Sequence, residues 1–155
     1  MFWDEVGRSC GGWDTHEKAE QRLKNELCPG LDQAYSALLE DLEQRGLLDE
    51  TIVICMGEHG RTLKPEKRNG LADGRGHWSR AYSVMLAGAG IRPGAIVGAS
   101  DEKAAFVKDR PVSPEDILAT MYHLKGIDPA TTVPDRLNRP IKLIQNGNVI
   151  TELLE

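Results

Sequence analysis

The sequence has few cysteines, no long apolar run and no excess of positive charge. Its three cysteines are an odd set without metal-type spacing, so no disulfide framework is expected. The longest apolar stretch, residues 51–56, has the length of a strand and not of a membrane helix. A net charge of −5 argues against bulk nucleic-acid binding, which depends on lysine and arginine. The acidic first residues lack the pattern of a secretory signal.

The composition predicts one folded domain over residues 1–155. Apolar residues make up 40% of the chain and charged residues 28%, which is an ordinary mixture for a globular protein with one core. Cys55 lies in an apolar strand pattern and is expected to be buried. Cys10 and Cys28 are expected to be free thiols.

The order of apolar patterns predicts an α/β fold. Residues 15–46 are expected to be mostly helical, with a kink or new start at Pro29 and an end at Gly46. The run at 51–56 predicts a strand buried on both faces, as in a parallel sheet covered by helices. Two further strands are expected, at residues 83–87 and 95–98. Residues 57–80 are expected to form a long loop, and loops of that length are usually functional or disordered.

The last third of the chain predicts a capped helix and a small β hairpin. Ser113 followed by proline and acids is typical of a helix start, and the helix is expected to end at Gly126. Its inward-facing residues are expected to be Ile117, Leu118, Met121 and Tyr122. Asn146-Gly147 lies between two apolar runs and indicates a hairpin turn.

Side chains that bind metals gather in glycine-flanked loops. They are Asp14, His16, Glu58, His59 and His77. Carboxylates and imidazoles bind ions such as Zn²⁺ or Mn²⁺, and the set suffices for one or two divalent ions. Taken alone, Asp14 or Thr15 is better explained as a simple helix cap, because Asp-Thr often precedes a helix. His77 taken alone is equally well explained as an exposed loop histidine.

The segment Glu58-His59-Gly60-Arg61 is the strongest single candidate. It follows the predicted buried strand, and the carboxyl ends of such strands are where α/β sheets place their ligand sites. Arg61 offers a planar fork for an oxyanion such as phosphate or sulfate. A plain polar loop is the alternative, but position and composition together favour a function. His123, late in a helix, is expected to have no catalytic role.

An ordered series of motifs extends this pattern. The motifs are Gly12–His16, Leu31–Leu42, Gly46–Ile54, Met56–Thr62, Gly76–Trp78 and Leu86–Gly90. This series resembles the DUF1501 family, which is abundant in planctomycetes and related bacteria. The family looks like a sulfatase-like branch of the alkaline phosphatase superfamily. The resemblance implies a partial alkaline-phosphatase-like sandwich, with a mostly parallel sheet flanked by helices and a small C-terminal β hairpin.

The resemblance also implies roles for matching residues. Glu58-His59 resembles the superfamily's Asp-His pair, which binds one metal ion, with Glu in place of the usual Asp. Asp14, His16 and His77 resemble the ligands of the other ion, which could be Zn, Mn or Ca. Arg61 is expected to balance negative charge that develops on the substrate.

The resemblance is to the C-terminal part of longer proteins, whose N-terminal half supplies the nucleophile. The nearest hydroxyls here, those of Thr15 and Thr62, do not match its position. The chain is therefore expected to be the metal-binding portion of a phosphatase- or sulfatase-like hydrolase, incomplete for catalysis, with a small phosphate or sulfate ester as substrate. The alternative is a non-catalytic module that associates, as a homo-oligomer, through an exposed sheet edge. Full-length relatives are often exported, but this chain carries no signal that indicates a compartment.

Overall fold

The computed structural model describes residues 12–68 and 71–155, and the chain divides into two compact units. The first unit consists of Met1–Leu47, Met56–Val84 and Ser100–Phe106. The second consists of Leu48–Cys55, Met85–Ala99 and Val107–Glu155. The chain thus passes between the units several times, so neither unit is one continuous stretch of sequence.

The fold is α+β, with short antiparallel two-stranded sheets, and the expected mostly parallel sheet is wrong. In the described residues, every strand pair with a defined register is antiparallel. An apolar β-branched run predicts that a strand forms, but it does not fix the direction of the partner strand. The alkaline-phosphatase-like sandwich expected from the resemblance is therefore not the architecture seen.

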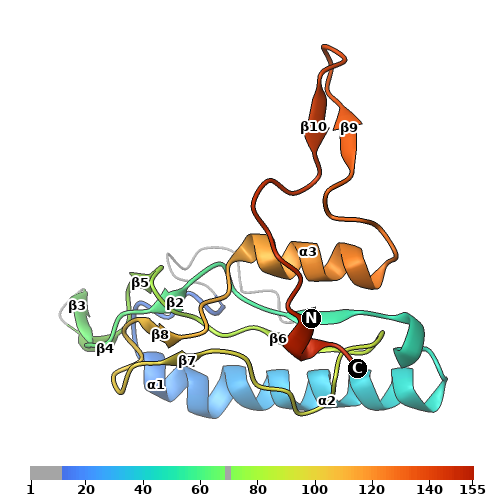
Figure 1. The fold of residues 1–155 in the computed structure, drawn as a ribbon. Helices are drawn as coiled ribbons and strands as arrows, with labels where there is room; N and C mark the ends of the chain where they lie inside the picture. The colour runs from blue at the N-terminus through green and yellow to red at the C-terminus, as the bar shows by residue number, and fades with distance from the viewer. Residues whose placement is uncertain (1–11, 69–70) are drawn as a thin grey trace. The chain divides into compact units, whose positions relative to one another are not determined.

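A nearly continuous helical segment in the first unit confirms the predicted helix. It consists of α1 (Ala19–Arg22), the π-helical turn η1 (Leu23–Leu27) and α2 (Cys28–Gln44) (Figure 1). Pro29 lies in the first turn of α2, directly after the π-helical turn η1. Gly46 ends the helix with a φ of 66°, a conformation that favours glycine.

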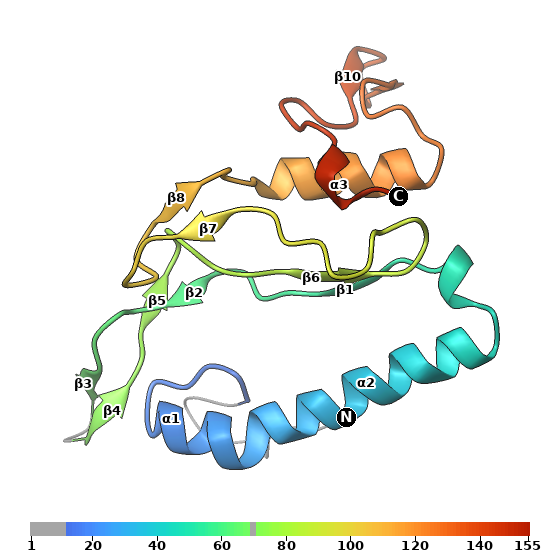
Figure 2. The same cartoon turned by 60° about the horizontal axis from the view of Figure 1, so that its bottom comes forward.

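The segment expected to be one long loop contains four short strands of the first unit. They are β2 (Gly60–Arg61), β3 (Glu66–Arg68), β4 (Leu71–Gly74) and β5 (His77–Trp78). β2 pairs with β5, and β3 pairs with β4 further out along the same hairpin (Figure 2). The β2–β5 register sets Arg61 opposite His77, and this pairing positions the candidate site.

In the second unit, β1 (Val53–Cys55) pairs with β6 (Met85–Ala87). Strands within the two predicted ranges are thereby confirmed. All three residues of β1 are only half-buried, so the predictions that this strand is buried on both faces and that Cys55 is buried are wrong. Among the described residues β6 is the one partner strand of β1.

The predicted strand at 95–98 does not form. Gly94 and Gly98, with φ angles of 71° and 81°, bend the backbone at both ends of the segment. A short strand follows instead: β7 (Ala99–Ser100) pairs with β8 (Val107–Asp109).

Helix α3 (Pro114–Leu124) confirms the predicted capped helix of the second unit. The Ser113 hydroxyl accepts the N–H of Asp116 at 3.1 Å, and the Asp116 carboxylate accepts the N–H of Ser113 at 2.8 Å. Ile117 is buried as predicted, whereas Leu118 is 47% exposed, so its assignment to the inward face is wrong. The buried face continues through Ala119 and Thr120 instead.

The C-terminal hairpin exists but uses other residues than expected. β9 (Thr132–Pro134) pairs with β10 (Pro140–Lys142), and the ribbon projects away from α3 (Figure 1). Asn146-Gly147 is not its turn. Gly147 packs so close to α3 that a Cβ would overlap a backbone oxygen there, and the next N–H, of Asn148, donates to Asp116 at 2.8 Å.

The apolar core lies in the second unit. Its buried members are Ile91, Ile117, Ala119, Ile144 and Ile150. Two short 3₁₀ turns, η2 (Leu48–Glu50) and η3 (Thr151–Leu153), complete this unit. Among the described residues of the first unit, buried side chains are small, as at Ala19 and Ala105. Across 12–68 and 71–155, no helix has the length and apolarity needed to cross a membrane.

Candidate metal centre

A tight turn before α1 presents Asp14 and His16. The N–H of Thr15 donates to the Trp13 carbonyl and that of His16 donates to the Asp14 carbonyl, both at 2.9 Å. Thr15 is 1% exposed, which anchors the turn. The helix itself begins after Lys18, without a side-chain cap. The structure therefore does not use Asp14 or Thr15 as the helix cap.

The chain between β4 and β5 packs directly against this turn. The N–H of Arg75 donates to the carbonyl of Thr15 at 3.1 Å. At Gly74, a Cβ would overlap the carbonyl of His16, so only glycine permits this approach. The contact holds β5 beside the turn and brings His77 to Asp14, 63 residues earlier in the chain.

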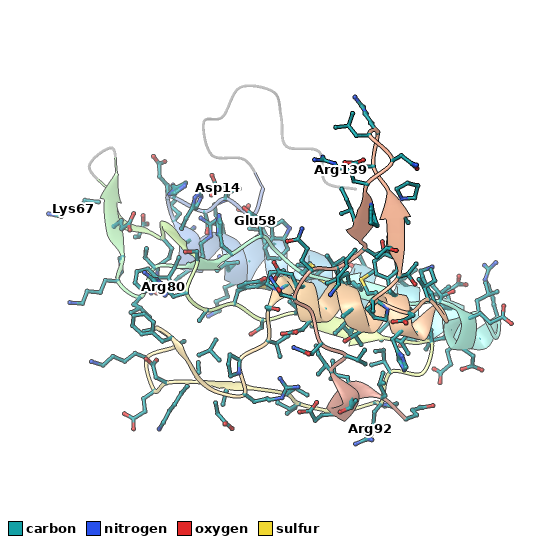
Figure 3. The ribbon with its side chains drawn as sticks, turned by 45° about the horizontal axis from the view of Figure 1, so that its top comes forward. Asp14, Glu58, Lys67, Arg80, Arg92 and Arg139 are labelled. Atoms are coloured by element: carbon teal, nitrogen blue, oxygen red, sulfur yellow. The ribbon has the colours of Figure 1, made fainter. Side chains whose placement is uncertain are left out.

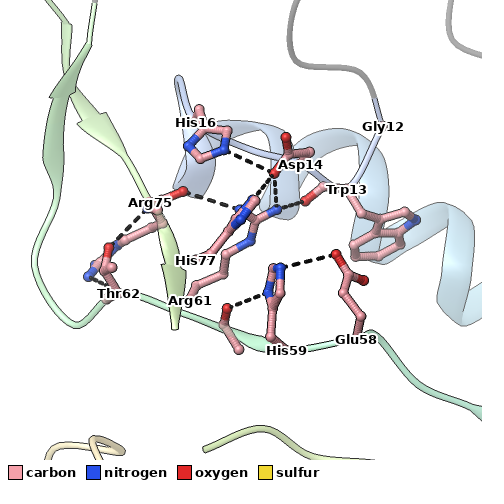
Figure 4. A network of polar contacts seen from close by, with 12 residues as sticks. Gly12, Trp13, Asp14, His16, Glu58, His59, Arg61, Thr62, Arg75 and His77 are labelled. Carbon is pink, nitrogen blue, oxygen red and sulfur yellow. Dashed lines mark hydrogen bonds and ion pairs between the residues drawn. The ribbon is translucent and has the colours of Figure 1, made fainter. Parts of the chain in front are cut away.

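Two imidazole side chains, those of His16 and His77, converge on one carboxylate oxygen of Asp14 (Figure 4). The Nε2 atoms of His77 and His16 lie 2.9 Å and 3.2 Å from Oδ1 of Asp14. One donor atom from each of these three residues falls within 4.8 Å of the others. The two imidazole centroids are 4.9 Å apart. Two imidazole nitrogens and one carboxylate oxygen are atom types that transition-metal ions bind, so these three residues could hold one.

Glu58 and His59 form a pair beside this group (Figure 4). Nε2 of His59 lies 3.2 Å from Oε1 of Glu58, and Nδ1 lies 3.0 Å from the carbonyl of Gly60. The His59 ring is 4.2 Å from that of His77, centroid to centroid. The side chain of Glu58 is 81% exposed, in the same region as Asp14 (Figure 3). The structure therefore brings all five predicted ligands into one unit, arranged as a group of three and an adjacent pair.

Arg61 is held within the site by acceptors from two loops. Its Nη2 donates to the Trp13 carbonyl at 2.6 Å and to Oδ1 of Asp14 at 2.9 Å. Its Nη1 donates to the carbonyl of Arg75 at 3.3 Å. The guanidinium thus fastens the turn at residues 12–16 to the β2–β5 ladder and fixes the carboxylate of Asp14.

The surroundings of Asp14 keep it ionised. The hydrogen bond with His77 lowers its pKa most. Partial burial raises the pKa, and the hydrogen bond from Arg61 and the charges of His16 and Arg61 lower it further, so the pKa of Asp14 falls to about 2. The carboxylate is accordingly charged at neutral pH, as a metal ligand must be.

Sequence reasoning missed how much of the site depends on Arg75. Its Nη1 donates to the carbonyls of Thr62, at 3.1 Å, and of Leu63. The hydroxyl of Thr62 is also engaged, because it accepts the N–H of Gly76 at 3.0 Å and donates to a backbone carbonyl. The sequence does place Arg75 between two glycines, which lets the backbone approach another segment closely while the long side chain reaches its carbonyls.

The structure describes two of the three remaining candidates. Cys28 is an exposed free thiol, as expected. Cys10 falls outside the described residues. His123 belongs to α3 in the second unit.

The fold and site define an α+β protein with a carboxylate–imidazole cluster built on a β hairpin. The sequence model described as "Protein of unknown function (DUF1501)" matches residues 6–154. The chain therefore belongs to the DUF1501 family, as its motifs indicated. No curated protein and no solved structure matches it.

Proposed function

We propose that this chain binds a divalent metal ion through Asp14, His16 and His77, as the metal-binding part of a hydrolase of phosphate or sulfate esters. One observation carries the proposal: both Nε2 atoms are directed at the same carboxylate oxygen, at 2.9 Å and 3.2 Å. Resemblance to sulfatase-like enzymes supports the ester chemistry, since Glu58-His59 resembles their metal-binding pair.

The residues present fit a metal ion. With bonds of about 2.0–2.2 Å, neighbouring ligands on a tetrahedral Zn²⁺ lie about 3.3 Å apart, close to the observed separations. The ion would share Asp14 with the arginine that fixes it, an arrangement typical of a supported ligand. Two imidazoles favour Zn²⁺ or Mn²⁺ over Ca²⁺, which prefers oxygen ligands alone.

When bound, the ion supplies Lewis-acid polarisation of the ester oxygens or an activated water. The chain's own residues position and stabilise this chemistry. Arg61 holds the carboxylate of Asp14 and places a fixed positive charge beside the ligands, where it offsets negative charge on the substrate. The pair of Glu58 and His59 offers a second ion two more ligands next to the first group.

Metal analysis of protein purified without chelator tests this proposal. We expect one Zn²⁺ or Mn²⁺ ion or more per chain, with His16→Ala and His77→Ala each weakening affinity by about a hundredfold or more. The matched control is His123→Ala, which removes an imidazole of the second unit and should leave metal binding unchanged. Equal metal content in all four proteins, or none in the wild type, contradicts the site.

Turnover is a separate measurement. Metal-loaded protein is assayed with p-nitrophenyl phosphate and p-nitrophenyl sulfate, and hydrolysis that disappears in His77→Ala supports the hydrolase.

The second candidate function is a non-catalytic module that associates. In the described residues β1 and β6 pair only with each other, which leaves sheet edges open to a partner strand. A stable dimer by light scattering, without metal, favours this candidate.

A further inference from the structure

An exposed tryptophan adjoins the ligand group. Trp13 immediately precedes Asp14 in the chain, and its side chain lies on the Glu58 side of the cluster (Figure 4). The residue is 49% exposed. Trp78, next to the ligand His77, is used differently: its Nε1–H donates to the carbonyl of Ala105 at 2.6 Å and its ring packs edge-on against Phe106.

The backbone that carries Trp13 is fixed on both sides. Arg22 Nη2 donates to the Gly12 carbonyl at 3.0 Å, and Arg61 Nη2 donates to the Trp13 carbonyl at 2.6 Å. The N–H of Thr15 donates to the same Trp13 carbonyl. Two arginines and a turn hydrogen bond therefore hold a short loop whose largest side chain is left half in solvent. A large aromatic group on a pre-ordered loop binds a ligand at little entropic cost.

We infer that the indole of Trp13 is the stacking surface for the organic group of the ester substrate. This inference rests on the proposed function, because the metal site would hold the phosphate or sulfate end. The group esterified to that end then extends past Asp14 to its neighbour in the chain. An indole face selects for a flat group, either an aromatic ring or the C–H face of a pyranose sugar, over an open alkyl chain.

Binding to the Zn²⁺-loaded chain tests the inference without requiring turnover. Calorimetric titrations compare phenylphosphonate, glucose 6-phosphate, methylphosphonate and inorganic phosphate, in the wild type and in Trp13→Ala. We expect Trp13→Ala to weaken phenylphosphonate or glucose 6-phosphate by about three- to tenfold and to leave methylphosphonate and inorganic phosphate unchanged. The ligand that responds identifies the group as aryl or sugar.

Two further variants make the result specific. Trp13→Phe keeps an aromatic face and should recover most of the lost affinity. Ile96→Ala removes a side chain that is 91% exposed in the second unit and should leave the affinity for all four ligands unchanged. Equal weakening of all four ligands overturns the inference, because Trp13 would then only support the metal loop. Unchanged affinity for all four in Trp13→Ala overturns it as well.

Zn²⁺ and phosphate binding by the wild type distinguishes a failure of the stacking surface from a failure of the proposed function. If the wild type binds Zn²⁺ and inorganic phosphate, and Trp13→Ala binds all four ligands with unchanged affinity, the stacking surface fails and the hydrolase proposal stands. If the wild type binds neither, the proposed function fails and the inference fails with it. Retained Zn²⁺ stoichiometry in Trp13→Ala shows that the site itself is intact.

Discussion

The interactions that stabilise the first unit internally differ from those that stabilise the second. The second unit buries isoleucines from its helix, loops and tail, whereas the described part of the first unit buries mainly Thr15, Ala19 and Ala105. In their place the first unit uses arginine side chains that donate to backbone carbonyls around the proposed metal ligands. The unit with the candidate site therefore buries less apolar surface and relies more on hydrogen bonds from arginine. Such hydrogen bonds fix the positions of side chains but contribute little net free energy to folding.

The largest expected effect is on the apolar unit. Ile150 is 1% exposed, and Ile150→Ala should lower the free energy of unfolding by about 2–5 kcal/mol, because it removes buried methyl groups and leaves a cavity. Urea denaturation followed by circular dichroism measures the loss. Ile96→Ala, at an exposed position, is the control and should stay within about 0.5 kcal/mol of the wild type. Similar losses in both variants contradict an isoleucine core.

The polar unit should respond next to loss of its anchoring arginine. Arg61→Ala removes charged hydrogen bonds to two carbonyls and Asp14 and should cost about 1.5–3 kcal/mol. Metal affinity should fall at the same time, because the carboxylate loses its fixed position. The measurements are urea denaturation and calorimetric Zn²⁺ titration.

Two variants check this cause. Arg61→Lys keeps the charge without the planar fork and should recover only part of the affinity. Arg80→Ala removes an exposed arginine of the same unit and should change neither quantity. If Arg61→Ala leaves Zn²⁺ affinity intact, the arginine does not position Asp14.

A smaller effect is expected at the start of α3. Ser113→Ala removes the hydroxyl that accepts the N–H of Asp116 and should cost about 1 kcal/mol of stability. Ser113→Thr retains an accepting hydroxyl and should lie near the wild type. Thermal unfolding of the three proteins provides the comparison, and a Thr variant as weak as the Ala variant argues against the cap.

The smallest effect concerns the pH dependence of the same cap. Burial raises the pKa of Asp116. The hydrogen bonds from Ser113 and Asn148 together lower this pKa by more than burial raises it, so that it lies below the ordinary 3.8. Its stabilising contribution is therefore complete above pH 3.8 and is lost as the pH falls below that value. The loss should be modest, because a protonated carboxyl still accepts hydrogen bonds. Denaturation series above and below pH 3.8 should show a steeper decline for the wild type than for Asp116→Asn.

Local signals predicted the helices well and the sheets poorly. Ser113, Pro114 and Gly126 specify the limits of α3 through contacts within a few residues. The direction and partner of β1 depend on β6, about thirty residues later, and no pattern within either strand encodes that choice. The missing strand at 95–98 is a local error, because the glycines at its ends were not weighed against its apolar residues.

The candidate site was predicted as a set of residue types and not as a geometry. Glycine-flanked acids and histidines marked all five proposed ligands, which the structure places in one unit. Their division into a group of three and a pair follows from the β2–β5 register and from the close approach at Gly74. The anchoring role of Arg75 and the exposure of Trp13 also depend on contacts between distant segments, which sequence patterns alone do not contain.

The interlaced path of the chain has a consequence for how the protein forms. Asp14 and His77 are separated by 63 residues, and part of the intervening chain belongs to the other unit. Closing a loop of this length restricts the unfolded chain at an entropic cost of about 4 kcal/mol. The carboxylate can meet its second imidazole only once the hairpin has folded back onto the turn at residues 12–16. A proteolytic nick at any single peptide bond between these residues leaves each fragment with only part of the cluster.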